Sequence, residues 1–200
     1  LQLRWEVQRN VFDAEHAGGR SWSSFTLTNR AAEPLPAQGW AIYFNCVAGV
    51  DMQVVEGPFA FERISGTWYR FRPTAAFAPL APGQSTQLSF FHPEIMVKTA
   101  KAPSGPYIVY DAAPQQGLVI ADYALAPFTR AEQWDHGPSN PMPLVTAEET
   151  YRRNTSIADV AEDAMPPVFP TPQQWQRGSG SLRWPVMPRV LADVGLKHEA

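Results

Sequence analysis

Apolar and polar residues alternate over roughly the first 125 residues, in short segments separated by turn residues. Successive side chains of a β-strand point to opposite faces, so such alternation predicts strands with one buried face. The segment LQLRWEVQ places its apolar residues on one face, namely Leu1, Leu3, Trp5 and Val7. In SSFTLTN, Phe25 and Leu27 share one face and hydroxyl side chains take the other. Both segments are predicted strands.

One segment, GWAIYFNCV, is apolar on both faces and is predicted to be a central strand. One face carries Trp40, Ile42, Phe44 and Cys46, and the other carries Ala41, Tyr43 and Val47. The series continues with MQVV, FAFERI, TWYRFR, STQLSFF, YIVY and GLVIADY. Roughly eight or nine short strands separated by Gly- and Pro-containing turns predict an all-β fold, an antiparallel β-sandwich.

The pattern changes after about residue 128. Residues 129–166 are polar and Pro-rich, and Thr146 is expected to cap a short helix that has Glu149 three residues further on. Residues 167–200 become extended and Pro-rich again, and they are too few to form a separately stable core. We therefore predict a sandwich over residues 1–128, a partly helical linker over 129–166, and an incomplete further segment over 167–200.

Composition narrows the classes of partner. The chain of 200 residues is 44% hydrophobic with a net charge of −3 and scattered basic residues, a distribution that gives no binding surface for nucleic acid. No apolar run reaches the length of a membrane span, and the N-terminal residues do not resemble a signal peptide. The single cysteine, Cys46, excludes an internal disulfide and is expected to be a small buried hydrophobe.

Catalytic and cofactor motifs are largely missing. The four histidines lie far apart along the chain, so no metal site is predicted. No Gly-x-Ser-x-Gly elbow, phosphate-binding loop or dinucleotide fingerprint occurs, so no cofactor is predicted. Adjacent acidic residues occur in the polar linker, where a solvated helix face is the simpler interpretation. A self-contained enzyme is the least favoured hypothesis.

The segment TWYRFRP contains the best candidate ligand site. Strand parity places Tyr69 and Phe71 in the core and puts Trp68 on the outer face beside Arg70. Trp22 has the same outward parity. Sugars stack their C–H faces on aromatic rings and bond polar side chains with their hydroxyls, so Trp68, Arg70 and Trp22 are candidate carbohydrate-binding residues. The alternative is that these indoles cover the margin of the core or contact a neighbouring domain.

Longer segments resemble a known family. SSFTLTNRAAEPLPAQGWAIYFN, FERISGTWYRFRPTAAFAPLAPGQS and GPYIVY resemble, in order and spacing, the N-terminal domain of bacterial chitobiases and related β-N-acetylhexosaminidases of glycoside hydrolase family 20. TAEETYRRN is similar to the link that follows this domain, and VFPTPQQW is similar to the opening of the small α/β domain that precedes the catalytic barrel. The resemblance covers nearly the whole chain.

The resemblance implies a sandwich similar to cellulose-binding modules, described in the family as a carbohydrate-binding domain. It implies a chitin-like glycan and the catalytic domain of the same parent protein as partners, and a periplasmic or secreted location. The family's catalytic Asp-Glu pair belongs to the barrel, and this sequence contains no Asp-Glu dipeptide. No catalytic residue is therefore predicted here.

Three hypotheses remain open. The first is a non-catalytic module that binds chitin-like or N-acetylglucosamine-containing glycans beside an attached hydrolase. The second is a structural module that packs on the catalytic domain and has no affinity for sugar. The third, a free-standing hydrolase, requires an acid pair that the sequence does not display.

Overall fold

The computed structural model describes residues 1–13, 15–16, 18–53, 55–138, 146–166, 168–176, 178–181, 183 and 185–186. Its strands are β1 (Gln2–Val11), β2 (Arg20–Thr28), β3 (Trp40–Asn45), β4 (Val55–Glu56), β5 (Phe59–Ser65), β6 (Trp68–Pro73), β7 (Ser85–His92), β8 (Ser104–Tyr110), β9 (Gly117–Val119) and β10 (Asp122–Leu125). Its helical segments are η1 (Thr99–Lys101), α1 (Ala131–Trp134), α2 (Ala147–Asn154) and η2 (Glu162–Ala164).

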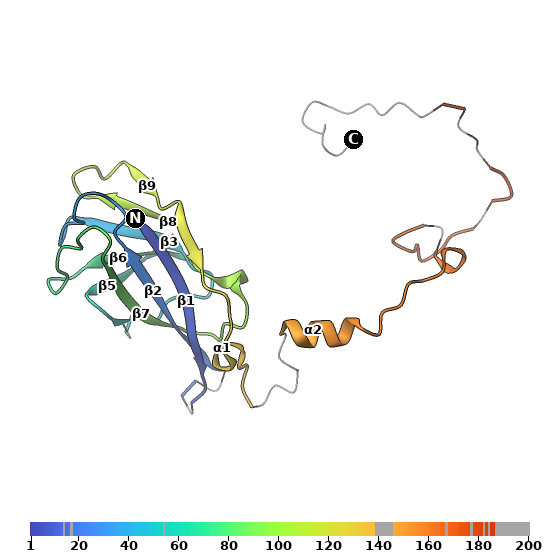
Figure 1. The fold of residues 1–200 in the computed structure, drawn as a ribbon, viewed down its shortest axis with the longest axis horizontal. Helices are drawn as coiled ribbons and strands as arrows, with labels where there is room; N and C mark the ends of the chain where they lie inside the picture. The colour runs from blue at the N-terminus through green and yellow to red at the C-terminus, as the bar shows by residue number, and fades with distance from the viewer. Residues whose placement is uncertain are drawn as a thin grey trace. The chain divides into compact units, whose positions relative to one another are not determined.

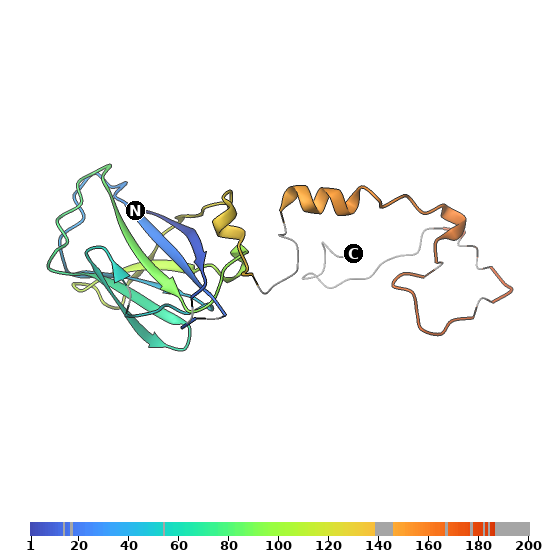
Figure 2. The same ribbon diagram turned by 90° about the horizontal axis from the view of Figure 1, so that it is seen from below.

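The strands form two five-stranded sheets that make the layers of a β-sandwich (Figures 1 and 2). The first sheet has the order β10-β1-β2-β7-β4, and the second has the order β5-β6-β3-β8-β9. The predicted all-β sandwich is confirmed. Within the segment GWAIYFNCV, residues Trp40–Asn45 form β3, which is the central strand of the second sheet, as predicted.

The core lies between the two sheets and is rich in aromatic rings. Phe25 of the first sheet contacts Phe44 of the second with ring centroids 5.3 Å apart, and Phe61 contacts Phe90 across the same interface at 4.9 Å. Most of the predicted apolar-face positions are buried, whereas Val47, predicted on one apolar face of GWAIYFNCV, is exposed; the buried ones include Leu3, Trp5, Val7, Phe25, Leu27, Trp40, Ile42, Phe44, Cys46, Tyr69 and Phe71. Burial of these rings supplies the main stabilisation of the sandwich.

One predicted segment, GLVIADY, forms two strands instead of one. It divides into β9 at the edge of the second sheet and β10 at the edge of the first. Ile120 is buried between them, and its N–H donates to the Pro106 carbonyl. β10 pairs in parallel with β1, whereas the other strand pairs are antiparallel. The chain thus crosses from one layer to the other and closes one side of the sandwich.

The helix α1 lies at the end of the sandwich where β1 ends (Figure 1). Its Gln133 side chain is fully buried, donates to the Val7 carbonyl at 2.6 Å, and accepts from the N–H groups of Thr129 and Arg130. These bonds satisfy backbone groups at the start of α1 and fix the helix to β1.

The helix α2 begins where the sequence predicted. The Thr146 side chain accepts a hydrogen bond from the Glu149 N–H at 3.1 Å, which confirms the N-cap. The Glu149 carboxylate pairs with Arg152 and Arg153 one turn further on, and the hydrogen bond from Arg152 contributes most to lowering its pKa.

The chain divides into two units, residues 1–156 and 157–200. The second unit contains η2 and no other helix or strand among its described residues. Much of the predicted segment 167–200, including residues 187–200, lies outside the described residues, so its resemblance to the start of an α/β domain stays a prediction, as do the boundaries at 128 and 166. No helix in the described part of the chain has the length and apolarity needed to span a membrane.

Candidate functional site

The outer face of the second sheet carries Trp68 and Arg70, as strand parity predicted. In β6 the side chains of Tyr69 and Phe71 are buried, whereas Trp68, Arg70 and Arg72 are partly exposed on the opposite face. Arg70 lies opposite Tyr43 of β3 in the ladder, and Trp68 lies opposite Asn45. The structure therefore brings Trp68 and Arg70 together on one surface.

Two tyrosines that the sequence prediction did not single out extend this surface. The rings of Tyr43 and Trp68 have centroids 5.6 Å apart, and those of Tyr43 and Tyr107 are parallel within 10° at 5.2 Å. The two tyrosine rings thus have the geometry of an offset stack, whereas the Trp68 ring is tilted by 34° relative to Tyr43. Trp68, Tyr43 and Tyr107, which we call the aromatic row, cross three adjacent strands, β6, β3 and β8.

A glycine lets the aromatic row reach towards the sheet edge. A Cβ atom at Gly117 of β9 would lie 2.9 Å from the Cδ2 atom of Tyr107, closer than side-chain carbons normally approach. The Tyr107 ring therefore lies against the backbone of β9, in the space that a side chain would occupy. The position of the last ring in the row depends on this glycine.

Arg70 is held rigidly beside the aromatic row. Its Nε and Nη2 groups donate to Oε2 of Glu62, and its Nη1 group donates to the Tyr43 hydroxyl at 2.8 Å. Burial lowers the pKa of Arg70, but the hydrogen bonds with Tyr43 and Glu62 outweigh it and leave the pKa above its ordinary value. The guanidinium stays charged and is neutralised by Glu62, so this surface offers fixed N–H donors without a net positive charge.

Trp22 lies on the outer face of the other sheet, away from Trp68 and Arg70. Its ring contacts Phe91 of β7 with centroids 4.5 Å apart, and the Arg20 guanidinium lies 4.1 Å from the Phe91 centroid. Trp22 also borders a hollow of about 610 Å³, which we call the Trp22 trough; it is lined by Gln8, Arg9, Trp22, Glu56, Gln87, Ser89, Arg130 and Glu132. One indole therefore stands among mostly polar side chains.

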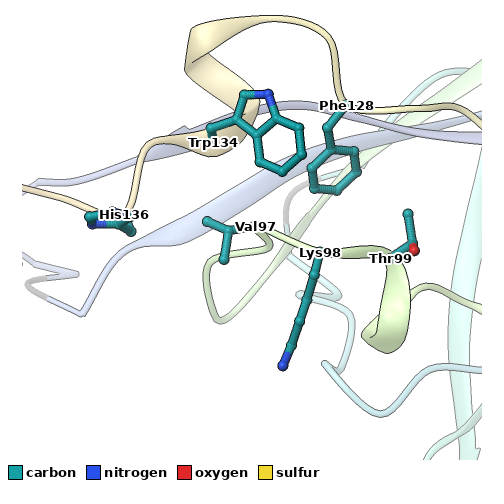
Figure 3. Close-up of a pocket in the computed structure, with 6 residues that line it drawn as sticks. All are labelled: Val97, Lys98, Thr99, Phe128, Trp134 and His136. Atoms are coloured by element: carbon teal, nitrogen blue, oxygen red, sulfur yellow. The ribbon is translucent and has the colours of Figure 1, made fainter. Parts of the chain in front are cut away.

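A separate pocket of about 480 Å³ lies beside α1, and we call it the end pocket (Figure 3). It is lined by Val97, Lys98, Thr99, Phe128, Trp134 and His136. The Phe128 and Trp134 rings meet edge to face with centroids 5.4 Å apart. None of these residues was a predicted site residue, because the segments 97–99 and 128–136, which include the start of η1 and the short helix α1, carry no recognisable motif.

Cys46 and His92 form a buried pair inside the core. The sulfur of Cys46 lies 3.5 Å from Nδ1 of His92, which is 2.6 Å from the Gly49 carbonyl oxygen. Burial raises the pKa of the Cys46 thiol to about 12 and lowers the pKa of His92 to about 4. Both groups are neutral and enclosed, so they are unsuited to nucleophilic chemistry. No cluster of three potential metal ligands occurs in the part of the chain that the structure describes.

Several solved structures have a similar fold at low sequence identity. A GH20 exo-β-N-acetylglucosaminidase from Vibrio harveyi in complex with N-acetylglucosamine is 12% identical, with a TM-score of 0.47, and the match covers 63% of this chain but only 18% of that enzyme. The chitin-binding domain of Chi18aC from Streptomyces coelicolor is 15% identical, with a TM-score of 0.36 over 55% of this chain and 92% of that domain.

A CBM3 module of Hungateiclostridium clariflavum is 12% identical, with a TM-score of 0.34 over 59% of this chain and 95% of that module. At these values the similarities are too weak to identify a ligand. No curated protein matches the chain.

A family model gives a direct assignment. The model described as "Putative carbohydrate binding domain" matches residues 1–148, which include the whole sandwich and α1. The match also contains the aromatic row, the Trp22 trough and the end pocket. The chain therefore belongs to this family of carbohydrate-binding domains.

Proposed function

We propose that the chain is a non-catalytic carbohydrate-binding module and that the aromatic row with Arg70 is its glycan-binding surface. The observation that carries the proposal is the run of three adjacent aromatic rings across β6, β3 and β8, next to a guanidinium that is fixed by Glu62 and Tyr43. Family membership supports the same conclusion.

The geometry suits a neutral, extended sugar chain. The adjacent rings offer apolar surface to the C–H faces of successive sugar units. Two of the five N–H donors of Arg70 remain free of the hydrogen bonds to Glu62 and Tyr43 and can reach hydroxyl or acetamido oxygens. Because Glu62 neutralises Arg70, charge gives no advantage to an anionic sugar. We propose a chitin-like or N-acetylglucosamine-containing glycan as the ligand.

We further propose that the module belongs to a β-N-acetylhexosaminidase-like hydrolase, whose catalytic domain it serves. The sequence resemblance supports this assignment, and the Vibrio harveyi enzyme contains a region of similar fold. Weak binding of glycan would keep the substrate near the attached active site and raise its local concentration. A periplasmic or secreted location is part of the same proposal.

The test compares affinity for chito-oligosaccharides between the full chain and its Trp68→Ala variant, by isothermal titration and affinity electrophoresis. We expect weak binding that falls at least about tenfold in the variant, which corresponds to about 1.4 kcal/mol. The Trp22→Ala variant is the matched control and should retain binding. Absence of heat and of retardation at millimolar sugar would instead favour a structural module that packs on a catalytic domain.

A further inference from the structure

The end pocket is built from two segments that are distant in the sequence and are joined by one buried amide. Asn10, near the end of β1, is 7% exposed. Its Oδ1 accepts from the Met96 N–H at 3.0 Å, and its Nδ2 lies within 3.1 Å of the Met96 carbonyl oxygen. Asn10 thus fixes the residue that directly precedes Val97, Lys98 and Thr99 of the pocket.

The same amide holds the opposite wall. Nδ2 of Asn10 also donates to the carbonyl oxygens of Gln133 and Asp135, at 3.2 and 2.8 Å. These two residues flank Trp134 and precede His136. Both walls are therefore anchored to β1, so the pocket exists before a ligand arrives and little ordering is needed on binding.

The lining combines apolar rings with polar atoms that need partners. Trp134 and Phe128 lie side by side above Val97, with Thr99 and His136 on either side, and the Lys98 side chain extends away from the rings (Figure 3). Both ring nitrogens of His136 are buried and have no hydrogen-bond partner among the described residues. Buried polar atoms of this kind are normally satisfied by water or by a ligand.

These features restrict the class of ligand. A volume of about 480 Å³ falls within the range of small-molecule pockets, about 300 to 1,000 Å³. The aromatic corner favours a ring with an apolar face. The Thr99 hydroxyl can donate to or accept from a ligand hydroxyl, and His136 can do the same once its imidazole turns a buried nitrogen towards the pocket. The lining contains no carboxylate, and its one ammonium extends away from the rings, so the ligand should be neutral.

We propose that the end pocket binds a single neutral hexopyranose ring, as a second sugar site separate from the aromatic row. The ring stacks on Trp134 and Phe128, its hydroxyls bond the Thr99 hydroxyl, and the His136 imidazole turns one of its buried nitrogens towards the sugar on binding. In its choice of a sugar ligand this inference rests on the proposed function, but it uses none of the residues of the aromatic row.

The experiment is an NMR titration of the full chain with N-acetylglucosamine and with glucose, in which the indole Nε1–H cross-peaks are followed. The Trp134 cross-peak is assigned by its loss in Trp134→Phe, and that of Trp68 by its loss in Trp68→Phe. We expect a saturable shift of the Trp134 cross-peak with at least one of these sugars. The Thr99→Val variant keeps the shape of the side chain and should weaken that binding about three- to tenfold.

Two controls separate this inference from the proposed function. The monosaccharide response of Trp134 should persist in Trp68→Ala, and the chito-oligosaccharide response of Trp68 should persist in Thr99→Val. A Trp134 cross-peak that stays unmoved at high millimolar sugar would overturn the inference, as would a Trp134 shift that disappears in Trp68→Ala. A chain whose Trp134 responds but whose aromatic row does not would refute the proposed function and leave this inference standing.

Discussion

The two outer faces of the sandwich each carry a tryptophan, but the surroundings differ. On the second sheet, Trp68 continues into Tyr43 and Tyr107 across neighbouring strands. On the first sheet, Trp22 contacts Phe91, whose ring is also covered by Arg20, and no further ring follows among the described residues of that face. The first sheet otherwise presents mainly hydroxyl, amide and charged side chains.

This difference shows that outward parity alone does not make a tryptophan a ligand platform. Aromatic surface of useful extent requires rings at matching positions on adjacent strands, as in the aromatic row. Trp22 has one aromatic partner, Phe91, and the ring of Phe91 is itself covered by the Arg20 guanidinium. We therefore expect Trp22 to stabilise the pairing between the start of β2 and the end of β7, and Trp68 to bind the glycan.

Both faces can be compared only while the sandwich is folded. The buried His92 makes the folded state less stable at acidic pH. Burial lowers the pKa of His92 from 6.5 to about 4, so between these values the unfolded chain binds a proton that the folded chain does not. The contribution that His92 makes to the free energy of unfolding is thus fully present above pH 6.5. It falls as the pH is lowered, by up to about 3 kcal/mol near pH 4. Urea unfolding at several pH values measures this loss.

The control for this pH dependence is His92→Phe, which keeps a ring in the core and removes the titration. We expect a shallower loss of stability between pH 6.5 and 4 in this variant, even if its stability at neutral pH is lower. Cys46, the neighbouring titratable group, has a raised pKa and stays protonated throughout this range. An unchanged slope in His92→Phe would assign the acid sensitivity to other groups.

Replacement of Trp22 should separate stability from binding. Trp22→Ala removes the contact with Phe91 and should lower the free energy of unfolding by about 1 to 2 kcal/mol, less than a fully buried tryptophan would cost. Affinity for chito-oligosaccharide should stay within twofold of the wild type. A large loss of affinity with little loss of stability would reverse the roles that we assign to the two faces.

Gly117, which lies beneath the aromatic row, offers a test that removes none of the aromatic rings. In Gly117→Ala the new methyl group would meet the Tyr107 ring at 2.9 Å, so the ring must shift and the row loses its alignment. We expect affinity for chito-oligosaccharide to fall several-fold, by up to about 1 kcal/mol. Gly18→Ala is the matched control, because an added Cβ there meets nothing within 4 Å. Equal affinities in the two variants would exclude Tyr107 from the binding surface.

The smallest expected effect concerns the hydrogen bond between Arg70 and the Tyr43 hydroxyl. Tyr43→Phe keeps the ring but removes the hydroxyl that accepts from Nη1 of Arg70. The loss of this partly exposed hydrogen bond should cost about 0.5 to 1 kcal/mol of stability and weaken glycan binding two- to threefold. Circular-dichroism melts and isothermal titration measure the two quantities. A gain in affinity would mean that the hydrogen bond with Tyr43 keeps Arg70 from reaching the ligand.

The alternation of apolar and polar residues along each strand predicted which side chains face the core and which face outward. Parity correctly separated Trp68 and Arg70 from Tyr69 and Phe71, and it assigned the double-sided apolar segment to the centre of a sheet. It also placed Trp22 on an outer face. These predictions need only the alternation of side chains along one strand.

The rest depends on which strands become neighbours, and one sequence does not show this. Tyr43 and Tyr107 join Trp68 only because β3 lies between β6 and β8. The segment GLVIADY divides into β9 and β10 because the chain crosses from one sheet to the other there. Its own apolar pattern does not indicate this. The end pocket depends on hydrogen bonds from Asn10 to residues far along the chain. Neither Asn10 nor Gln133 belongs to a sequence motif that would have predicted these hydrogen bonds.

The most direct test of the central claim is an NMR map of backbone amide shifts in the full chain during titration with a chito-oligosaccharide. Our account predicts that the largest shifts cluster on β6, β3 and β8 around Trp68, Tyr43 and Tyr107. Shifts that cluster instead on β2 and β7 around Trp22, or a spectrum that does not change with sugar, would contradict it.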